Sequence, residues 1–326
     1  MHAIRLHAFG PADNLRYEEV HDPRPGPGQA RIAVAACGVH LIDTALRAGR
    51  PMGPLALPEL PTIPGREVAG VVDAVGPEVD ERWVGERVAT HLGAASGGYA
   101  ELAVREIEAL HRLPDGLADD AAVAMIGTGR TALAILEVAA LTAEDVVLVT
   151  AAAGGLGSLL VQAARDAGAT VIGVAGGTAK VQRVAQLGAT FAVDYSAADW
   201  SVAVRGALDG REVTAALDGV GGAVGRGALE LLGAGGRLIL FGFSSGTPTE
   251  LSAGDLFGRG ITVSAAIGAR MAQRSGGLRD LEEQALAAAA DGRLVPLVQR
   301  FALAQAAAAH EAIESRATIG KTVLVP

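Results

Sequence analysis

A strand-like run that leads through a glycine-rich turn into a helix is the feature that most constrains this chain. The run is Val146–Thr150, and the helical pattern after the turn stops at Gly168. Gly154 and Gly157 occupy the second and third positions of the G-x-G-x-x-G fingerprint, with Ala152 at the first. Small residues let the backbone approach a pyrophosphate, which the helix N-terminus attracts through its unpaired N–H groups and dipole. The turn predicts dinucleotide binding; the alternative is a plain tight turn between a strand and a helix.

Strand-like and helix-like segments alternate around this turn. The helix after the turn covers Gly155–Ala167, and the further strand-like runs are Thr170–Val174, Phe191–Val193, Val213–Leu217 and Arg237–Phe241. Such alternation is typical of a parallel sheet with helices on both faces. We therefore expect an α/β fold with a Rossmann doubly wound parallel sheet in residues 119–261.

The segments on either side of this region have a different pattern. Short β-type runs such as Arg31–Ala36 and Val68–Val75, separated by Gly/Pro turns, predict an all-β domain with a barrel-like core. After Ile261 the alternation fades, and the chain ends in a helix at about Leu278–Ala290 and a strand at Thr322–Val325. A chain of 326 residues is about two average domains long. We expect residues 1–118 and 262–326 to form one domain and residues 119–261 the other.

Charge and composition exclude several classes of function. The formal net charge is −9 and no short window is rich in Lys or Arg, which argues against nucleic-acid binding. The first five residues are polar and no apolar run reaches about 18 residues, so we expect neither a signal peptide nor a membrane span, and a cytoplasmic location. Cys37 is the only cysteine, so neither an internal disulfide nor a zinc knot built on cysteines can form.

The second strand of the nucleotide-binding region indicates which coenzyme binds. NAD enzymes usually carry Asp or Glu about 20 residues after the glycine turn, where it holds the ribose 2′-hydroxyl. Val171–Arg183 contains no acidic residue, but it contains Lys180 after the small polar turn Gly176–Thr178. This pattern favours NADPH over NADH. The alternative is that Lys180 is a solvated helix residue.

Taken together, these motifs resemble the zinc-free medium-chain dehydrogenases/reductases, especially the NADPH quinone oxidoreductases. Further landmarks of the resemblance are Cys37–Asp43, Pro64–Gly70, Gly98–Glu101, Leu187–Ala189, Asp218–Gly222, Phe241–Gly242, His310–Arg316 and Gly320–Lys321. The resemblance covers nearly the whole chain. It implies a GroES-like barrel beside the Rossmann domain, hydride transfer from NADPH to a small-molecule quinone or enone, and a homodimer.

The resemblance also implies a set of coenzyme-binding residues. Lys180, Tyr195 and Arg316 would surround the adenosine phosphate, while Thr131, Gly242 and Phe243 would lie by the nicotinamide. The remaining members of the set are Ala153, Gly154, Gly155, Leu156, Gly157, Gly176, Val220, Phe241 and Lys321. Three have alternatives: core packing for Tyr195, a surface ion pair with Glu314 or Glu311 for Arg316, and the start of a helix for Thr131.

Residue types argue against a catalytic zinc ion. Zinc-dependent members of the superfamily carry ligands at the positions of His40 and Arg66, and a guanidinium has no free lone pair with which to bind zinc. We therefore expect no metal. Hydride addition to an already activated acceptor, such as a quinone or the β-carbon of an enone, does not need one.

His40 is the candidate catalytic residue, because imidazole titrates near working pH. We hypothesise that it hydrogen-bonds the substrate oxygen or a ribose hydroxyl and donates a proton; the alternative is a histidine satisfied by the backbone. We expect mainly structural roles for Asp43, Arg47, Glu67 and Cys37.

Two other functions remain open from the sequence. One is an enoyl-thioester reductase or a polyketide-tailoring enoyl reductase, which shares the fold and the coenzyme. The other is a non-catalytic NADPH-binding sensor or structural protein.

Overall fold

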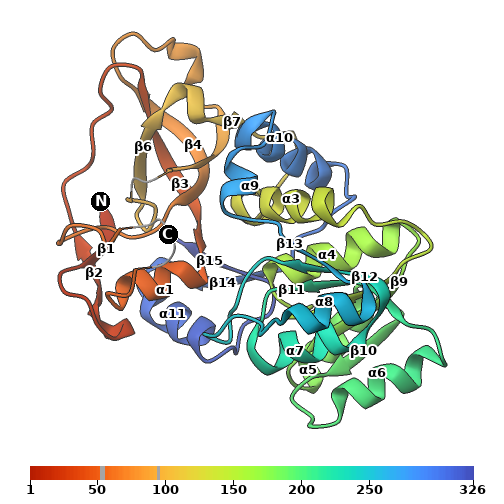
Figure 1. Ribbon diagram of the computed structural model, residues 1–326. Coiled ribbons are helices and arrows are strands. Elements are labelled where there is room, and N and C mark those ends of the chain that lie inside the picture. The colour runs from red at the N-terminus through yellow and green to blue at the C-terminus, as the bar shows by residue number, and fades with distance from the viewer. Residues whose placement is uncertain (52–55, 94–95) are drawn as a thin grey trace. The chain divides into compact units, whose positions relative to one another are not determined.

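The computed structural model describes residues 1–51, 56–93 and 96–326, which form two compact units (Figure 1). Unit 1 contains Met1–Thr128 and Glu282–Pro326, and unit 2 contains Gly129–Leu281. Both boundaries come later in the chain than the expected 118/119 and 261/262. The first falls inside a continuous helical stretch whose beginning, α2 (Asp119–Ala124), packs on the sheet of unit 1.

Unit 2 is built on one parallel sheet of six strands in the order β10-β9-β8-β11-β12-β13. The strands are β8 (Val146–Val149), β9 (Thr170–Ala175), β10 (Phe191–Asp194), β11 (Val213–Asp218), β12 (Leu232–Leu240) and β13 (Thr262–Ala265). All five neighbouring pairs are parallel. This is the strand order of the doubly wound dinucleotide-binding fold, and it confirms the predicted fold class.

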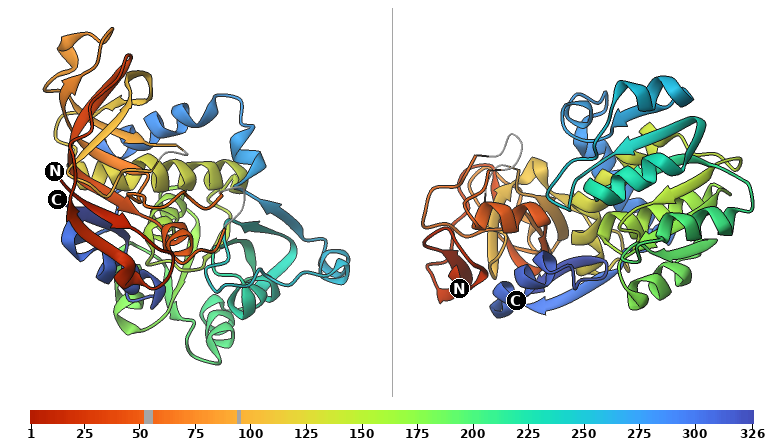
Figure 2. Two further views of the ribbon diagram at one scale, coloured as in Figure 1. Left: turned by 90° about the vertical axis from the view of Figure 1, so that its left-hand side faces the viewer. Right: turned by 60° about the horizontal axis from the view of Figure 1, so that its bottom comes forward.

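Helices cover both faces of this sheet (Figure 2). They are α3 (Arg130–Ala139), α4 (Gly155–Asp166), α5 (Thr178–Gln186), α6 (Trp200–Leu208), α7 (Gly222–Leu231) and α8 (Ala253–Arg259), and the short α9 (Ala269–Ala272) follows β13 in the chain. Every residue of β8 is buried, as expected for a central parallel strand.

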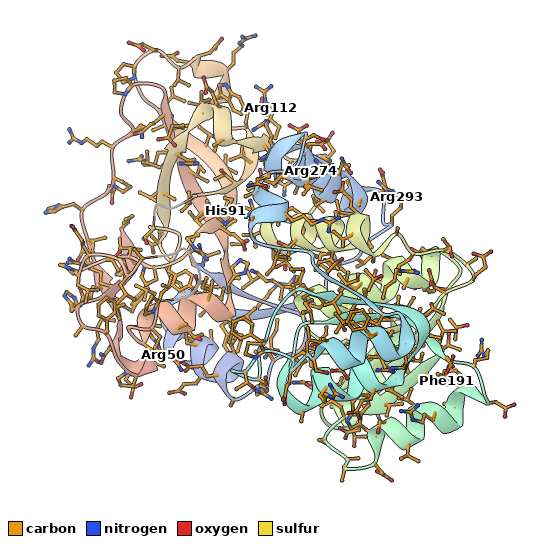
Figure 3. All side chains as sticks on the ribbon, viewed as in Figure 1. Arg50, His91, Arg112, Phe191, Arg274 and Arg293 are labelled. Carbon is orange, nitrogen blue, oxygen red and sulfur yellow. The ribbon has the colours of Figure 1, made fainter. Side chains whose placement is uncertain are left out.

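Arg274, labelled in Figure 3, links α3 to the segment at the start of α10 (Gly277–Ala290). It donates to Glu137 on α3 at 2.6 Å and to Asp280 at 2.7 Å.

The sixth strand, β13, is absent from the sequence-based expectation. It is short, lies at the edge of the sheet beside β12, and consists of Thr-Val-Ser-Ala. Its first and last residues are exposed, so it lacks the continuous apolar run that identified the central strands.

Unit 1 is built on a seven-stranded sheet in the order β14-β15-β3-β4-β5-β7, with β6 also paired to β3. The strands are β3 (Gln29–Val39), β4 (Glu67–Val75), β5 (Arg87–His91), β6 (Leu102–Glu106), β7 (His111–Arg112), β14 (Val298–Ala302) and β15 (Lys321–Val325). A separate hairpin contains β1 (His2–Leu6) and β2 (Leu15–Glu19). The buried side chains of these strands, including Ile32, Val68 and Leu324, form one apolar core.

The strand register in unit 1 positions three chain segments side by side. Thr322 of β15 is opposite Val39 of β3, and Val68 of β4 is opposite Cys37 on the other side of β3. The residue after β3 and the first residues of β4 and β15 therefore meet at one end of the sheet. Those residues are His40, Glu67 and Lys321.

The remaining helices of unit 1 include α1 (Leu41–Arg47) and α11 (Ala306–Glu314), while α10 (Gly277–Ala290) contains the second unit boundary. The helical stretch Asp119–Ala139 is long and apolar enough, by length and composition, to cross a membrane. However, 61% of its most apolar window is buried inside the protein, as in a core helix.

Candidate active site

The glycine turn after β8 has the geometry of a phosphate-binding loop. Ala151 adopts a left-handed backbone with φ of 47°, and Gly154 caps α4 in an extended conformation without a side chain. The first N–H groups of a helix have no intrahelical partners, so α4 offers donors here. A Cβ on Gly157 would lie 2.2 Å from the Ala151 carbonyl oxygen, so only glycine fits where α4 crosses the strand end. Of the predicted residues, the turn brings Ala153, Gly154, Gly155, Leu156 and Gly157 together.

The neighbouring strand β9 ends in a second small turn. Gly176 follows β9 directly, and the ring of Tyr195 lies so close that a Cβ on Gly176 would be 3.3 Å from its Cε2 atom. Lys180 is the third residue of α5. The carboxylate of Asp194 accepts hydrogen bonds from Gly177 N and from Ser196, and the bond from Gly177 lowers its pKa. Asp194 therefore shapes this turn, a role that sequence reasoning missed.

The ends of β11 and β12 are organised by a buried carboxylate. Asp218 accepts hydrogen bonds from Thr150 Oγ1 at 2.8 Å, Thr249 Oγ1 at 2.7 Å and Val220 N at 2.9 Å. Phe241 N in turn donates to the Asp218 carbonyl at 2.9 Å. Sequence reasoning assigned Val220, Phe241, Gly242 and Phe243 but not the carboxylate that fixes their loops.

The carboxyl ends of β8, β9, β11 and β12 thus share one edge of the parallel sheet, the edge where such folds bind ligands. Phe241 is buried, whereas the Phe243 side chain is 45% exposed. Thr131 is the second residue of α3 in the same unit. Arg316 and Lys321 belong to unit 1. Arg316 follows α11 with φ of 56°, and Glu314, one of its expected alternative partners, pairs with Arg47.

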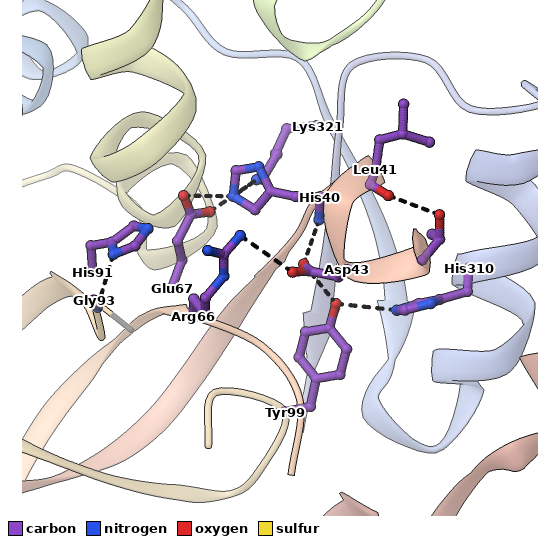
Figure 4. Close-up of polar contacts among 11 residues, drawn as sticks. His40, Leu41, Asp43, Arg66, Glu67, His91, Gly93, Tyr99, His310 and Lys321 are labelled. Carbon is purple, nitrogen blue, oxygen red and sulfur yellow. Dashed lines mark hydrogen bonds and ion pairs between the residues drawn. The ribbon is translucent and has the colours of Figure 1, made fainter. Parts of the chain in front are cut away.

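A compact polar cluster lies at the sheet end of unit 1 (Figure 4). The Lys321 ammonium donates to Glu67 Oε2 at 2.9 Å and lies 2.7 Å from His40 Nε2. The same His40 nitrogen is 2.6 Å from Glu67 Oε1. Glu67 is fully buried and Lys321 is 5% exposed, while 26% of the His40 side chain is exposed. We call His40, Glu67 and Lys321 the sheet-end triad.

Burial and the neighbouring charges shift the pKa values within the triad. Burial alone would raise the pKa of the Glu67 carboxyl, but His40 and Lys321 hold it well below its usual range. Burial lowers the pKa of the Lys321 ammonium, and Glu67 only partly opposes this. Lys321, expected from the resemblance to contact the coenzyme, is thus engaged with His40 and Glu67.

Asp43 connects the triad to a second network. Its Oδ2 accepts from His40 N at 2.8 Å and from the Tyr99 hydroxyl at 3.2 Å, and Tyr99 also contacts His310 Nε2 at 3.2 Å. Burial raises the pKa of Tyr99 well above its usual range and lowers the pKa of His310 to about 4, so both are neutral at pH 7. These contacts agree with the structural role expected for Asp43.

A small pocket opens beside Asp43, with Arg47 and Arg66 in its wall. Arg47 donates to Glu314 at 2.5 Å, but within the described parts of the chain its Nε and Nη1 atoms have no partner. Arg66 Nη2 is 3.7 Å from Asp43 Oδ1, too far for a hydrogen bond. Leu46 and Pro64 contribute apolar surface. The pocket therefore combines apolar walls with two incompletely paired cations.

The sheet-end triad does not fit a zinc ion. His40 and Glu67 carry groups that bind zinc, but the Lys321 ammonium lies within 2.9 Å of both, where a metal would be repelled. Within residues 1–51, 56–93 and 96–326, no three His, Cys, Asp or Glu side chains are grouped to hold a metal ion.

Comparisons with known proteins find families and relatives that match the chain across both units. A family described as zinc-binding dehydrogenase matches residues 155–288, and the alcohol dehydrogenase GroES-like domain matches residues 26–115. A quinone oxidoreductase of Pseudomonas aeruginosa is 33% identical over 99% of both chains. A 2-haloacrylate reductase of Burkholderia sp is 36% identical over 99% of this chain and 98% of its own. The crystal structure of Escherichia coli quinone oxidoreductase complexed with NADPH matches all of both chains with a TM-score of 0.87 and 27% identity.

Proposed function

This chain belongs to the quinone oxidoreductase-like branch of the medium-chain dehydrogenase/reductase superfamily, and from this we propose that it is an NADPH-dependent reductase of quinones or α,β-unsaturated carbonyl compounds. The observation that carries the proposal is the edge of the parallel sheet in unit 2. There a glycine turn that suits a pyrophosphate stands next to the end of β9, where Gly176 follows the strand and Lys180 lies in the first turn of α5.

The residues of unit 2 fit the coenzyme. The α4 N-terminus would hold the pyrophosphate, and Lys180 and Tyr195 beside Gly176 would hold the 2′-phosphate, joined by Arg316 of unit 1. Thr131, Val220, Phe241, Gly242 and Phe243 would position the nicotinamide half. When bound, NADPH supplies a hydride. For Thr131, Tyr195 and Arg316 the alternatives are the start of a helix, core packing and a surface ion pair. Titration of the protein with NADPH tests these alternatives together with the proposal.

Unit 1 supplies the groups that hold and protonate the acceptor. His40 is the catalytic candidate, because its side chain is partly exposed while Glu67 and Lys321 fix its Nε2 edge. Hydride addition to an enone leaves negative charge on the acceptor oxygen, and a nearby N–H group stabilises that charge and then transfers a proton. No Lewis acid is needed for such an activated acceptor.

The direct test is coenzyme consumption. The purified protein is mixed with NADPH or NADH and a panel of quinones, enones, aldehydes and crotonyl thioester, and the loss of absorbance is followed. We expect oxidation of NADPH with quinones or enones and a kcat/KM at least about tenfold lower with NADH, because one charged hydrogen bond contributes about 1.5–3 kcal/mol. NADPH binding without consumption on any acceptor would instead support a sensor, and preference for the thioester an enoyl-thioester reductase.

The pocket beside Asp43 favours a second acceptor class, α,β-unsaturated carboxylates. The wall contains the two guanidinium groups of Arg47 and Arg66 against the one carboxylate of Asp43, so these side chains favour a negatively charged acceptor. The similarity to a 2-haloacrylate reductase supports the same class.

Arg66→Gln should separate acids from neutral acceptors. We expect kcat/KM for 2-chloroacrylate to fall about 10- to 100-fold, because a charged hydrogen bond worth about 1.5–3 kcal/mol is lost. The rate with its methyl ester should change less than about threefold. Steady-state kinetics with both compounds make the comparison, and Arg66→Lys serves as the charge-preserving control. Equal losses on acid and ester would reject carboxylate recognition.

We further propose a homodimer that is soluble and cytoplasmic, which the resemblance supports. Sedimentation at micromolar concentration tests the oligomeric state.

A further inference from the structure

One nitrogen atom in the sheet-end triad has two competing neighbours. His40 Nε2 lies 2.7 Å from Lys321 Nζ and 2.6 Å from Glu67 Oε1. A nitrogen of a neutral imidazole either donates or accepts a hydrogen bond, so it cannot satisfy an ammonium and a carboxylate at the same time. The two contacts therefore correspond to two different protonation arrangements of the same three side chains.

In the first arrangement, Lys321 is an ammonium that donates to both Glu67 Oε2 and His40 Nε2. The imidazole then carries its proton on Nδ1, and Glu67 Oε1 has no donor, in keeping with its lack of a hydrogen-bond partner among the described residues. In the second arrangement, His40 carries its proton on Nε2 and donates it to Glu67 Oε1 at 2.6 Å. Lys321 is then a neutral amine. The two arrangements differ by one proton lost from the triad.

We infer that Lys321 is the source of the proton that His40 delivers to the reduced acceptor, with Glu67 as the group that receives the imidazole N–H afterwards. The inference rests on the proposed reductase function. After hydride addition the acceptor is an enolate. The His40 Nδ1–H bond breaks as a C–H or O–H bond forms on the acceptor, and Lys321 transfers a proton to Nε2. After product release, solvent water returns a proton to His40 Nδ1 and the Nε2 proton passes back to Lys321, which restores the first arrangement and balances the cycle.

The surroundings of Lys321 suit a group that gives up a proton. It is 5% exposed, and burial penalises its charged form. The charged or titratable groups that affect the triad are Asp43, which favours the ammonium, Arg66, which disfavours it, and His91, which acts on Glu67. Because a quarter of the His40 side chain is exposed whereas Lys321 and Glu67 are buried, only His40 can reach an acceptor.

Lys321→Arg separates proton supply from a structural role. Arginine keeps the positive charge and can still pair with Glu67, but its pKa above about 12 prevents proton release. We expect kcat for an α-methyl enone to fall about 100-fold, the lower range of general-acid contributions. The product should also lose its single configuration at the α-carbon, because water then protonates the enolate from either face. Lys321→Met should behave in the same way.

The pH profile gives an independent readout. The relay needs the ammonium form, so kcat for the enone in the unaltered protein should decline as pH rises through the pKa of Lys321, which lies below its ordinary 10.5. Lys321→Arg should lack this decline. His40→Asn should show the same low rate and the same loss of stereochemistry, without dependence on pH between about 6 and 8.

Quinone turnover and NADPH affinity are the controls for the variants. A reduced quinone is an oxyanion that can leave and take its proton from water, so in Lys321→Arg the rate with quinones should fall less than the rate with the enone. Full enone activity and a single product configuration in Lys321→Arg would overturn the relay while leaving the reductase function intact. Absence of turnover with every acceptor in the unaltered protein would reject the proposed function itself.

Discussion

Replacing Gly176 with Asp is expected to reverse the coenzyme preference from NADPH to NADH. The new carboxylate would stand directly after β9, where it repels a 2′-phosphate but accepts a hydrogen bond from a free ribose 2′-hydroxyl. The substitution fits the backbone, since the new Cβ would lie 3.3 Å from Tyr195 Cε2 and the ring need move only slightly. We expect the Kd for NADPH to rise about 100-fold and that for NADH to fall about tenfold, consistent with about 1.5–3 kcal/mol for each charged hydrogen bond.

Fluorescence titration with both coenzymes measures the reversal. Gly206→Asp is the matched control, because it adds the same charge to α6 of the same unit at a position with nothing within 4 Å of the new Cβ. Lys180→Ala should weaken NADPH binding without improving NADH binding. If Gly176→Asp bound NADPH as tightly as the control does, the 2′-phosphate would not lie at this strand end, and the assignment of Lys180 and Tyr195 would fall with it.

The sequence predicted the nucleotide-binding unit well because its determinants are local. A buried parallel strand is a continuous apolar run, and the glycine turn marks where that strand meets a helix. These two signals identified β8, β9, β10 and β11 to within one residue at their ends. The start of β12 and all of β13 were not predicted from the sequence, because Leu232–Gly236 is glycine-rich and β13 is a short, half-exposed edge strand.

The sheet-end triad could not be predicted in the same way. His40 and Lys321 are 281 residues apart, and Glu67 and Lys321 are 254 apart. Only the register of β15 and β4 on either side of β3 brings them together, and register depends on the whole packed sheet. The resemblance indicated that Lys321 matters, but it assigned the residue to the coenzyme. The role of the buried Asp218 carboxylate was not predicted for the same reason. Thr150 and Thr249, whose hydroxyl groups donate to it, come from distant segments of the chain.

Gly157→Ala should have the largest effect on coenzyme binding of any single-methyl change in unit 2. The added Cβ would lie 2.2 Å from the Ala151 carbonyl oxygen and 2.7 Å from Ala152 Cα. Both are backbone atoms, so no side chain can rotate to relieve the contact, and α4 must move away from the end of β8. Such overpacking costs about 1–3 kcal/mol of unfolding free energy. A displacement of about 1 Å at a positioning element costs about 100-fold in function. We expect the Kd for NADPH to rise at least that much.

Two graded controls separate the turn from a general effect of replacing glycine. Gly154→Ala places its Cβ 3.2 Å from the Ala151 oxygen, a tight contact that a small adjustment relieves, so its effect should be intermediate. Gly206→Ala, inside α6 with open space around it, should stabilise the protein by about 0.5–1 kcal/mol through helix propensity and leave coenzyme binding unchanged. Urea unfolding measures the unfolding free energy of the three variants, and NADPH titration measures their Kd values, so the predicted order of effects can be checked. If Gly157→Ala bound NADPH like Gly206→Ala, α4 would not need to approach β8 so closely, and the pyrophosphate would not be held by the N-terminus of α4.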